Sequence, residues 1–110
     1  RLDKPLSKEY IFDNIVMSVN EEKHELSIDG NLIKLNPKEF QVVILLLKNL
    51  NNLVPRMELI KKVWGEDYFG DTRTLDVHIR RIRVKLSHKD FGSKYITTIH
   101  GYGYKITDKI

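Results

Sequence analysis

Residues 72–89, TRTLDVHIRRIRVKLSHK, restrict the fold more than any other part of this sequence. They include neither glycine nor proline, and Asp71 just before them is of a residue type that commonly caps the start of a helix. Apolar residues recur at steps of four, three and four, which places them on one side of a helix. They are Leu75, Ile79, Ile82 and Leu86. The segment therefore predicts an amphipathic helix that packs this stripe against a core.

The opposite side of the predicted helix is almost purely basic. On a wheel of about 100° per residue it carries Arg73, Val77, Arg80, Arg81 and Val84. The segment holds six arginines and lysines against a single acid, Asp76, which gives a net charge of +5, while the whole chain carries +4. The excess positive charge thus lies on one helix, as expected of a surface that faces a polyanion. Val77 would suit contact with a thymine methyl group in a DNA major groove. The alternative is an ordinary solvated basic helix.

Length and composition limit the possible classes of protein. A chain of 110 residues, 41% hydrophobic and 31% charged, predicts one globular domain. No apolar run approaches the roughly 18 residues of a membrane span. The absence of cysteine excludes a disulfide framework and thiolate metal sites. We therefore expect a cytoplasmic protein with no membrane contact and no cofactor. The basic balance by itself favours nucleic acid and an anionic membrane surface equally as partners.

The rest of the chain predicts an α+β fold in a domain that spans residues 10–107. Residues 1–9 are polar, include Lys4-Pro5 and do not begin with methionine, so we interpret them as the remnant of a linker in a longer protein. From Tyr10 onward the apolar pattern has a period of two, and Asp29-Gly30 is a strong hairpin signal. Together these features predict an N-terminal antiparallel sheet of three or four strands.

Two further helices are expected between this sheet and the basic helix. Residues 36–39 (NPKE) combine an N-cap, a proline at the first helical position and a capping-box glutamate, and they precede a strongly apolar helix. Residues 56–64 predict the second helix, with Met57 and Trp64 among its inward residues and a weak start at Pro55. After a loop at residues 91–93, residues 95–99 and 104–106 predict a C-terminal hairpin.

A three-helix core with a basic third helix, followed by a hairpin, is the pattern of a winged helix-turn-helix. Four motifs resemble, in order and spacing, those of the OmpR/PhoB family of response regulators: residues 35–40 (LNPKEF), 63–65 (VWG), 68–83 (YFGDTRTLDVHIRRIR) and 99–105 (IHGYGYK). The resemblance implies the DNA-binding effector domain of a two-component transcriptional regulator, which in the whole protein follows a phosphorylatable receiver domain. It implies sequence-specific binding of double-stranded DNA, with the basic helix in the major groove and the hairpin wing at the minor groove. It also implies tandem head-to-tail pairs on direct-repeat half-sites.

The resemblance extends to individual positions. The residues expected on or beside the DNA surface are Arg73, Thr74, Val77, His78, Arg80, Arg81 and Arg83 in the helix, and His100, Tyr102 and Lys105 in the wing. The loop expected to contact RNA polymerase consists of Gly65, Glu66, Asp67, Tyr68, Phe69, Gly70 and Asp71. His78 and Arg83 lie nearer the sides of the wheel, so we expect them to touch phosphate at most. His100 stands where the family commonly has arginine, and Val84 where a basic residue is frequent, so weaker DNA contacts are expected at both.

Other classes of function receive less support. The four histidines show neither HExxH spacing nor adjacent acidic ligands, and no serine lies in a G-x-S-x-G context, so we do not expect an enzyme. Two binding alternatives stay open: a protein-interaction module that docks an acidic partner through the same helix, and a binder of RNA or single strands. Steep salt dependence would favour duplex DNA over the first. Most aromatic residues occupy core-compatible positions, which argues against the second.

Overall fold

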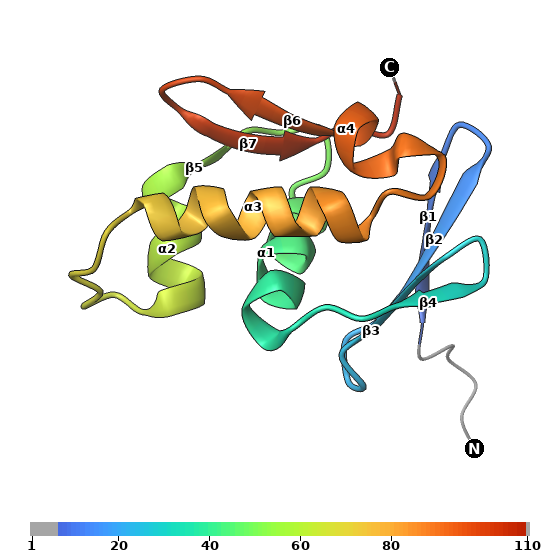
Figure 1. Ribbon diagram of the computed structural model, residues 1–110, viewed down its shortest axis with the longest axis horizontal. Helices are drawn as coiled ribbons and strands as arrows, with labels where there is room; N and C mark the ends of the chain where they lie inside the picture. The colour runs from blue at the N-terminus through green and yellow to red at the C-terminus, as the bar shows by residue number, and fades with distance from the viewer. Residues whose placement is uncertain (1–6, 110) are drawn as a thin grey trace.

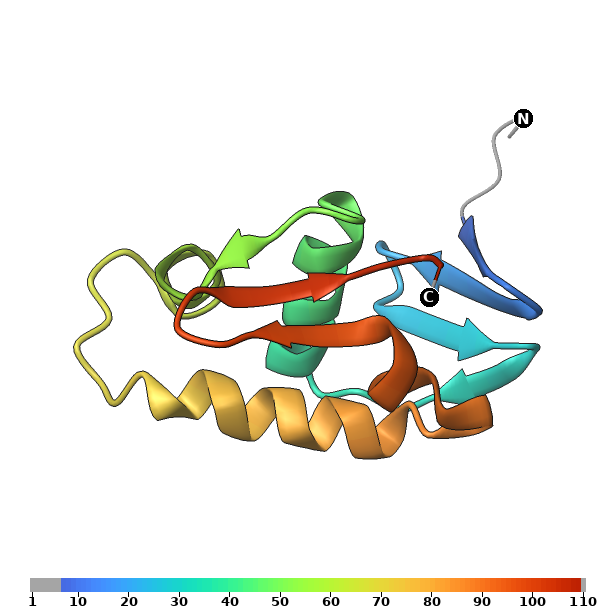
Figure 2. The same ribbon diagram turned by 90° about the horizontal axis from the view of Figure 1, so that it is seen from above.

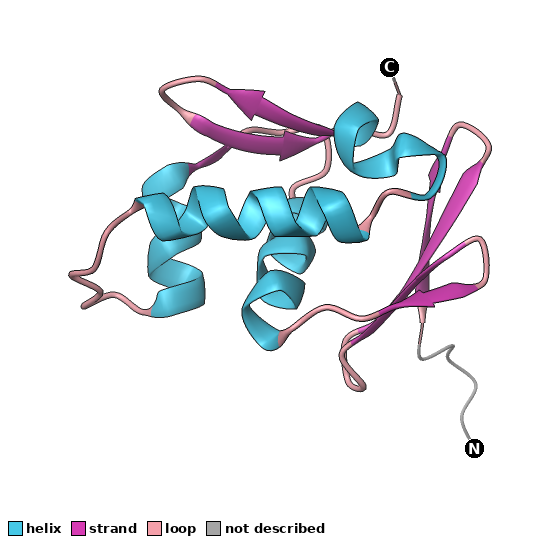
Figure 3. Ribbon diagram, in the orientation of Figure 1, coloured by secondary structure: helices cyan, strands magenta, loops and turns pink. Residues whose placement is uncertain are grey.

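The computed structural model describes residues 7–109 and contains two antiparallel sheets and a group of helices (Figure 1, Figure 3). The first sheet has its four strands in sequence order: β1 (Lys8–Phe12), β2 (Ile15–Asn20), β3 (Glu25–Ile28) and β4 (Asn31–Ile33). Asp29 and Gly30, between β3 and β4, have φ angles of 49° and 85°, as a two-residue hairpin turn requires. The predicted sheet is confirmed. Its first strand begins at Lys8, before the expected boundary at Tyr10, and most of the predicted linker lies outside the described residues.

Helix α1 (Pro37–Lys48) is the central helix, and its first turn forms as predicted. The Glu39 backbone N–H donates to Asn36 Oδ1 at 2.8 Å, and the Asn36 backbone N–H donates to Glu39 Oε1 at 2.9 Å, which closes the capping box. The buried apolar residues of α1 are Phe40, Val42, Val43, Leu46 and Leu47. They join the inner face of the first sheet and the other helices in one hydrophobic core.

Helix α2 (Arg56–Trp64) has the predicted bounds, and Pro55 at its start provides no side-chain cap. The inward position predicted for Met57 is wrong, because this side chain is 49% exposed. The buried residues of α2 are Leu59, Ile60 and Val63. On a helical wheel Met57 lies roughly 110° from the centre of this stripe, so it faces solvent.

Helix α3 (Arg73–Lys85) is shorter than the predicted segment. After it come a single 3-10 turn, η1 (His88–Asp90), and a short helix, α4 (Phe91–Tyr95), so the loop predicted at residues 91–93 is helical. Gly92 permits this reversal: its N–H donates to the Leu86 carbonyl at 2.8 Å, and a Cβ here would lie 2.6 Å from the Arg83 Cα. The helix therefore ends where the chain packs back upon it, a long-range effect that the helical pattern does not encode.

The second sheet is the C-terminal hairpin, called the wing below, plus one strand that was not predicted. The wing consists of β6 (Ile96–Ile99) and β7 (Gly103–Ile106), and β5 (Val54–Pro55), just before α2, pairs with β7. Strand β6 begins one residue later than predicted because Tyr95 ends α4. A Cβ on Gly103 would lie 2.1 Å from the Val54 carbonyl oxygen, so only glycine permits this pairing.

The elements place α3 and the wing side by side at one surface. Figure 1 shows α3 crossing the molecule with the wing above it, and in Figure 2 the wing strands run alongside α3. The first sheet lies at one end of α3 and the loop between α2 and α3 at the other. Within residues 7–109, no helix has the length and apolar character needed to cross a membrane.

Candidate nucleic-acid interface

Helix α3 has two faces of opposite character, as predicted. The inward residues are at most 1% exposed: Leu75, Ile79, Ile82 and Leu86. The outward residues are all exposed: Arg73, Val77, Arg80, Arg81 and Val84. The apolar stripe therefore anchors the helix, and a row of basic and small apolar side chains faces solvent.

The six basic residues of segment 72–89 differ in what they bind. Four of them contact other protein groups: Arg73 binds Asp71, Arg83 binds the wing, Lys85 binds Glu39 and Lys89 binds Asp29. Arg80 and Arg81 form neither a hydrogen bond nor an ion pair with any group in residues 7–109. The segment's net charge of +5 therefore overstates the positive charge that a partner would meet, which rests mainly on these two guanidinium groups.

Arg73 is paired but accessible. Its Nη2 lies 2.7 Å from Asp71 Oδ2, and Asp71 Oδ1 also accepts the Arg73 backbone N–H at 2.9 Å. Asp71 thus accepts a backbone N–H from the first turn of α3, although Thr72 occupies the N-cap position. The side chains are 82% and 56% exposed, and so exposed a pair contributes little stability. Arg73 can therefore exchange its carboxylate for another anion.

Thr74 and His78 lie on the flank of α3 that faces α2, and both are half-buried. His78 Nδ1 lies 2.8 Å from the Thr74 carbonyl oxygen, and the imidazole packs edge-on against Trp64 with ring centroids 4.9 Å apart. The sideways position expected for His78 agrees with this geometry.

Arg83 points toward the wing, on the flank of α3 where the helical wheel placed it. Its Nη2 donates to the Ile96 carbonyl at 2.8 Å and to Thr98 Oγ1 at 2.9 Å, and its guanidinium lies 6.0 Å from the centroid of the Tyr104 ring. Burial lowers the pKa of Arg83. The Arg83 side chain therefore links α3 to β6 through hydrogen bonds.

The wing presents the three residues that the sequence singled out. His100 and Tyr102 are exposed at its turn, and Lys105 is half-buried on β7 opposite Thr97. Gly101, between the first two, has a φ of 84°, which the tight turn requires.

A cluster around Asp76 was not predicted. Arg56 donates two hydrogen bonds to the Asp76 carboxylate, from Nη1 to Oδ1 at 2.6 Å and from Nη2 to Oδ2 at 3.1 Å. The Tyr104 hydroxyl also donates to Asp76 Oδ1. The hydrogen bonds from Arg56 lower the pKa of Asp76, and burial followed by the bond to Asp76 raises the pKa of Tyr104. The only sequence signal for this cluster was a lone acid in a basic helix.

A groove of about 570 Å³ runs between α3 and the wing. Its lining comprises two arginines, three hydroxyl-bearing residues, one acid and one valine: Arg80, Arg83, Ser87, Ser93, Tyr104, Asp76 and Val84. Arg80 is the exposed cation at its edge. With Asp76 held by Arg56, the groove suits a chain of phosphates.

The loop between α2 and α3 is acidic and carries an exposed aromatic ring. Phe69 is 95% exposed, and Glu66 and Asp67 beside it are also exposed. Tyr68 is half-buried against Trp64, and its hydroxyl donates to the Asp71 carbonyl at 3.2 Å. This loop, which includes Gly65 and Gly70, therefore presents Phe69 among carboxylates at one end of the molecule.

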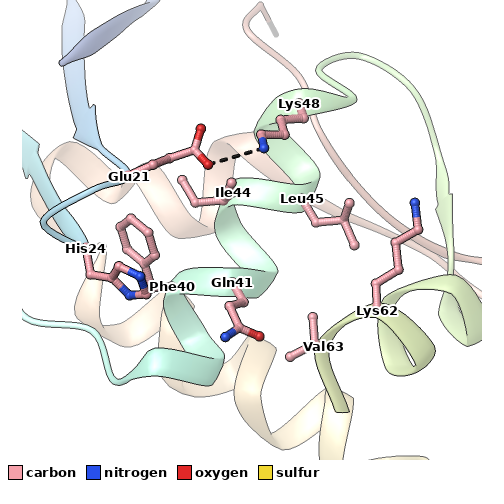
Figure 4. Close-up of a pocket in the computed structure, with 9 residues that line it drawn as sticks. All are labelled: Glu21, His24, Phe40, Gln41, Ile44, Leu45, Lys48, Lys62 and Val63. Carbon is pink, nitrogen blue, oxygen red and sulfur yellow. Dashed lines mark ion pairs between the residues drawn. The ribbon is translucent and has the colours of Figure 1, made fainter. Parts of the chain in front are cut away.

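A second groove, of about 310 Å³, lies between α1, α2 and the turn after β2 (Figure 4). His24 stacks on Phe40 at one side, and Glu21 and Lys48 form an ion pair 3.2 Å long at another. Lys62 and Val63 of α2 complete it. No group of three or more potential metal ligands occurs in the described part of the chain.

Comparison with known proteins agrees with this architecture. The family model described as "Transcriptional regulatory protein, C terminal" matches residues 30–106. The sensory transduction protein RegX3 of Mycobacterium tuberculosis is 41% identical over 85 residues, which cover 77% of this chain and 37% of RegX3. The chain thus spans little more than a third of the length of this relative.

Two solved structures resemble the whole domain. The DNA-binding domain of Bacillus subtilis CssR superposes with a TM-score of 0.70 at 33% identity, covering 82% of this chain and 98% of CssR's. The DNA-binding domain of Escherichia coli CpxR gives a TM-score of 0.76 at 29% identity, covering 92% and 97% of the two chains. This chain belongs to the family of C-terminal domains of transcriptional regulatory proteins, the winged-helix effector domains of OmpR/PhoB-type response regulators.

Proposed function

We propose that this domain binds specific sequences of double-stranded DNA, as the effector domain of a two-component transcriptional regulator. Helix α3 enters the major groove, which is wide enough to admit a helix, and the wing lies at the adjacent minor groove. The observation that carries this proposal is the pair of exposed guanidinium groups, Arg80 and Arg81, that the described protein leaves without a partner beside the exposed Val77.

Each outward side chain has a role that its chemistry allows. Arg80 and Arg81 can donate two hydrogen bonds each to a guanine edge or to a phosphate, and Val77 can contact a thymine methyl group. Arg73 exchanges Asp71 for a phosphate. The groove between α3 and the wing receives the backbone of the strand that flanks the major groove, with Arg80 at its edge.

The wing contributes through His100, Tyr102 and Lys105. His100 is exposed at the turn of the wing and can donate a hydrogen bond to a phosphate. Affinity measured for the wild type and for His100→Ala tests this contact. His100→Ala should bind DNA more weakly, and equal affinities would exclude the contact.

On direct-repeat operators the domain binds as a tandem head-to-tail pair. The expected result is one domain on a duplex with one half-site and two on a duplex with both, measured by sedimentation. A single domain on the two-site duplex at saturation would contradict this arrangement. In the whole regulator, an N-terminal receiver domain precedes this domain in the same chain.

The acidic loop of residues 65–71 contacts RNA polymerase. The exposed Phe69 among carboxylates supports this proposed contact, since aromatic residues are enriched at protein interfaces. In transcription with the whole regulator, Phe69→Ala should reduce activation while operator affinity stays unchanged. Leu32→Ala, which removes another exposed apolar side chain on β4, is the matched control and should change neither. Full activation by Phe69→Ala would exclude this role of the loop.

Selection of duplexes from a random library, followed by competition binding, tests DNA recognition directly. The wild type should prefer the selected duplex over random competitor, and binding should weaken steeply with salt. If Arg80 or Arg81 reads a base, replacing it with alanine should weaken binding by about 1–3 kcal/mol and relax specificity. Lys23→Ala, which removes a charge at the distant turn after β2, should change little. Failure to select any sequence would favour an acidic protein as the partner of α3.

A further inference from the structure

We infer that Asp76 is a positioning residue that fixes the wing relative to α3, so that helix and wing meet DNA as one rigid unit. The inference rests on the proposed function and adds a specific role for an acid that itself contacts no DNA. The residues that act with it are Arg56 at the start of α2 and Tyr104 on β7.

Three separate elements meet at this one carboxylate. Arg56 holds both oxygens of Asp76 in a bidentate contact and also donates from Nη2 to the Thr72 carbonyl at 3.3 Å, so it ties α2 to the first turn of α3. The Tyr104 hydroxyl donates to the same carboxylate and ties the wing to α3. Bidentate and charge-assisted bonds fix geometry more strictly than neutral ones, so the cluster sets the separation between helix and wing.

The backbone around Arg56 reinforces the attachment. The Arg56 N–H donates to the Tyr102 carbonyl at the turn of the wing, at 3.0 Å. Directly before it, β5 pairs with β7, with Val54 opposite Tyr104 and Pro55 opposite Gly103. The residue that neutralises Asp76 therefore also holds the tip of the wing.

A second attachment lies two turns further along α3. Arg83, seven positions after Asp76, falls on nearly the same side of the helix and donates to β6 through the Ile96 carbonyl and Thr98 Oγ1. Two attachments along one flank explain why the wing runs beside α3 in Figure 2. Arg80 lies between them on the edge of the groove, so the position of the wing also decides the width of the groove that Arg80 borders.

Electrostatics gives a reason for an acid at this place. A carboxylate on a helix that faces phosphates repels them and lowers affinity unless it is neutralised. Asp76 is the only acid among residues 72–89, and Arg56 neutralises it from the side. Its presence is therefore explained by the contact it makes with the wing. Val54, Leu75 and Ile106 are buried in the apolar core.

Tyr104→Phe tests the inference with the least disturbance. It removes only the hydroxyl that joins the wing to Asp76, leaves the ring in place, changes no charge and leaves Arg56 paired with Asp76. Tyr95→Phe is the matched control, because the Tyr95 hydroxyl makes the same kind of bond to Asp13 Oδ2, at 2.6 Å, between α4 and the first sheet. A role limited to stability would affect both variants alike.

Two measurements distinguish positioning from stability and from failure of the proposed function. In the free domain, heteronuclear NOE values at residues 99–103 should fall in Tyr104→Phe and stay at wild-type values in Tyr95→Phe. On the duplex selected by the wild type, hydroxyl-radical protection at the wing should disappear in Tyr104→Phe, while protection of major-groove guanines from methylation persists. Affinity should fall by about three- to tenfold, since the bond that is removed is charge-assisted.

Each outcome has a definite meaning. Reduced NOE values together with loss of the wing footprint in Tyr104→Phe alone support the inference. Wild-type NOE values and a complete footprint in Tyr104→Phe would overturn it and leave DNA binding intact. Reduced NOE values in a domain whose wild type selects no duplex would uphold the attachment of the wing and overturn its role in DNA binding.

Discussion

The outer face of α3 and its two flanks contain the same kinds of basic residue but use them differently. On the outer face, Arg80 and Arg81 form neither a hydrogen bond nor an ion pair with any group in residues 7–109. On the flanks, Arg83 binds the wing and Lys85 reaches the buried Glu39 of α1 at 2.6 Å. A count of charges in the sequence treats these four residues alike. In the structure, Arg80 and Arg81 are free of these internal bonds and therefore available to an external anion, whereas Arg83 and Lys85 are held by the protein.

A basic helix can thus be anchored to the protein on its flanks and still offer arginines on its outer face to an external anion. The flank residues fix the rotation of α3 about its axis through bonds to α1 and to the wing. That rotation points the unpaired arginines outward. Removal of a flank residue should therefore appear first in the free energy of unfolding, and removal of an outer arginine first in DNA affinity.

The largest effect is expected for the contact between Lys85 and Glu39. Glu39 is fully buried, and its Oε1 accepts hydrogen bonds from Lys85 and from the Asn36 N–H, while its Oε2 has no partner in residues 7–109. Lys85→Met should lower the free energy of unfolding by about 3 kcal/mol, near the lower end for a broken buried ion pair because Lys85 is itself 39% exposed. Urea unfolding near neutral pH measures it.

The same contact predicts a pH dependence. Burial raises the pKa of Glu39, but the hydrogen bonds from Lys85 and Asn36 outweigh it, and the net pKa lies below the usual 4.5. The stabilisation is thus present above pH 4.5 and is lost as the pH falls, so the difference between Lys85→Met and the wild type should narrow in acid. Lys62→Met, which breaks an exposed pair with Glu58 at 3.7 Å, is the control and should change stability by less than about 0.5 kcal/mol.

A smaller effect is expected where α3 meets β6. Arg83→Ala should lower the free energy of unfolding by about 1–2 kcal/mol, because it removes two hydrogen bonds and leaves the Ile96 carbonyl without this donor. Arg80→Ala, one turn away, is the matched variant and should leave stability within about 0.5 kcal/mol of the wild type. Equal losses of stability in the two variants would contradict the division between flank and outer face.

His88 and Lys89, at the end of the basic segment, also bind a carboxylate of the protein, and this contact should make stability depend on pH. The Val16 N–H, then His88 and Lys89, bind the Asp29 carboxylate and lower its pKa from 3.8 to about 2. Because the pKa is lower in the folded state, the stabilisation is present above pH 3.8 and is lost as the pH falls toward 2. Asp29→Asn should therefore be less stable than the wild type near pH 5, and the two stabilities should converge near pH 2. A constant difference between them would mean that the carboxylate charge is not involved.

The smallest effect is expected at Asp71. Asp71→Asn weakens an exposed ion pair, so the free energy of unfolding should hardly change. It also frees Arg73 and removes a negative charge beside the first turn of α3, so DNA affinity should rise severalfold at low salt. Reduced affinity would show that Asp71 orients Arg73 for DNA and does not compete with it.

The sequence could predict those features that depend on neighbouring residues. The capping box of α1, the Asp29-Gly30 turn and the apolar stripe of α3 follow from spacing alone. The features that were missed depend on contacts between distant segments. Strand β5 exists because Gly103 allows β7 to approach Val54, and α3 ends early because Gly92 packs against Arg83. Arg56 and Tyr104 lie 20 and 28 positions from Asp76, and Glu39 lies 46 positions from Lys85, so local pattern could not identify these partners.

The salt dependence of DNA binding by the double variant Arg80→Ala/Arg81→Ala shows whether these two arginines form the DNA-binding surface of α3. On the duplex selected by the wild type, the logarithm of the association constant should fall linearly with the logarithm of salt concentration. If both arginines contact phosphates or groove edges, the slope should shrink by about two and the footprint should weaken, with the free energy of unfolding unchanged. An unchanged slope and footprint would contradict the claim that the unpaired arginines of α3 form the DNA-binding surface.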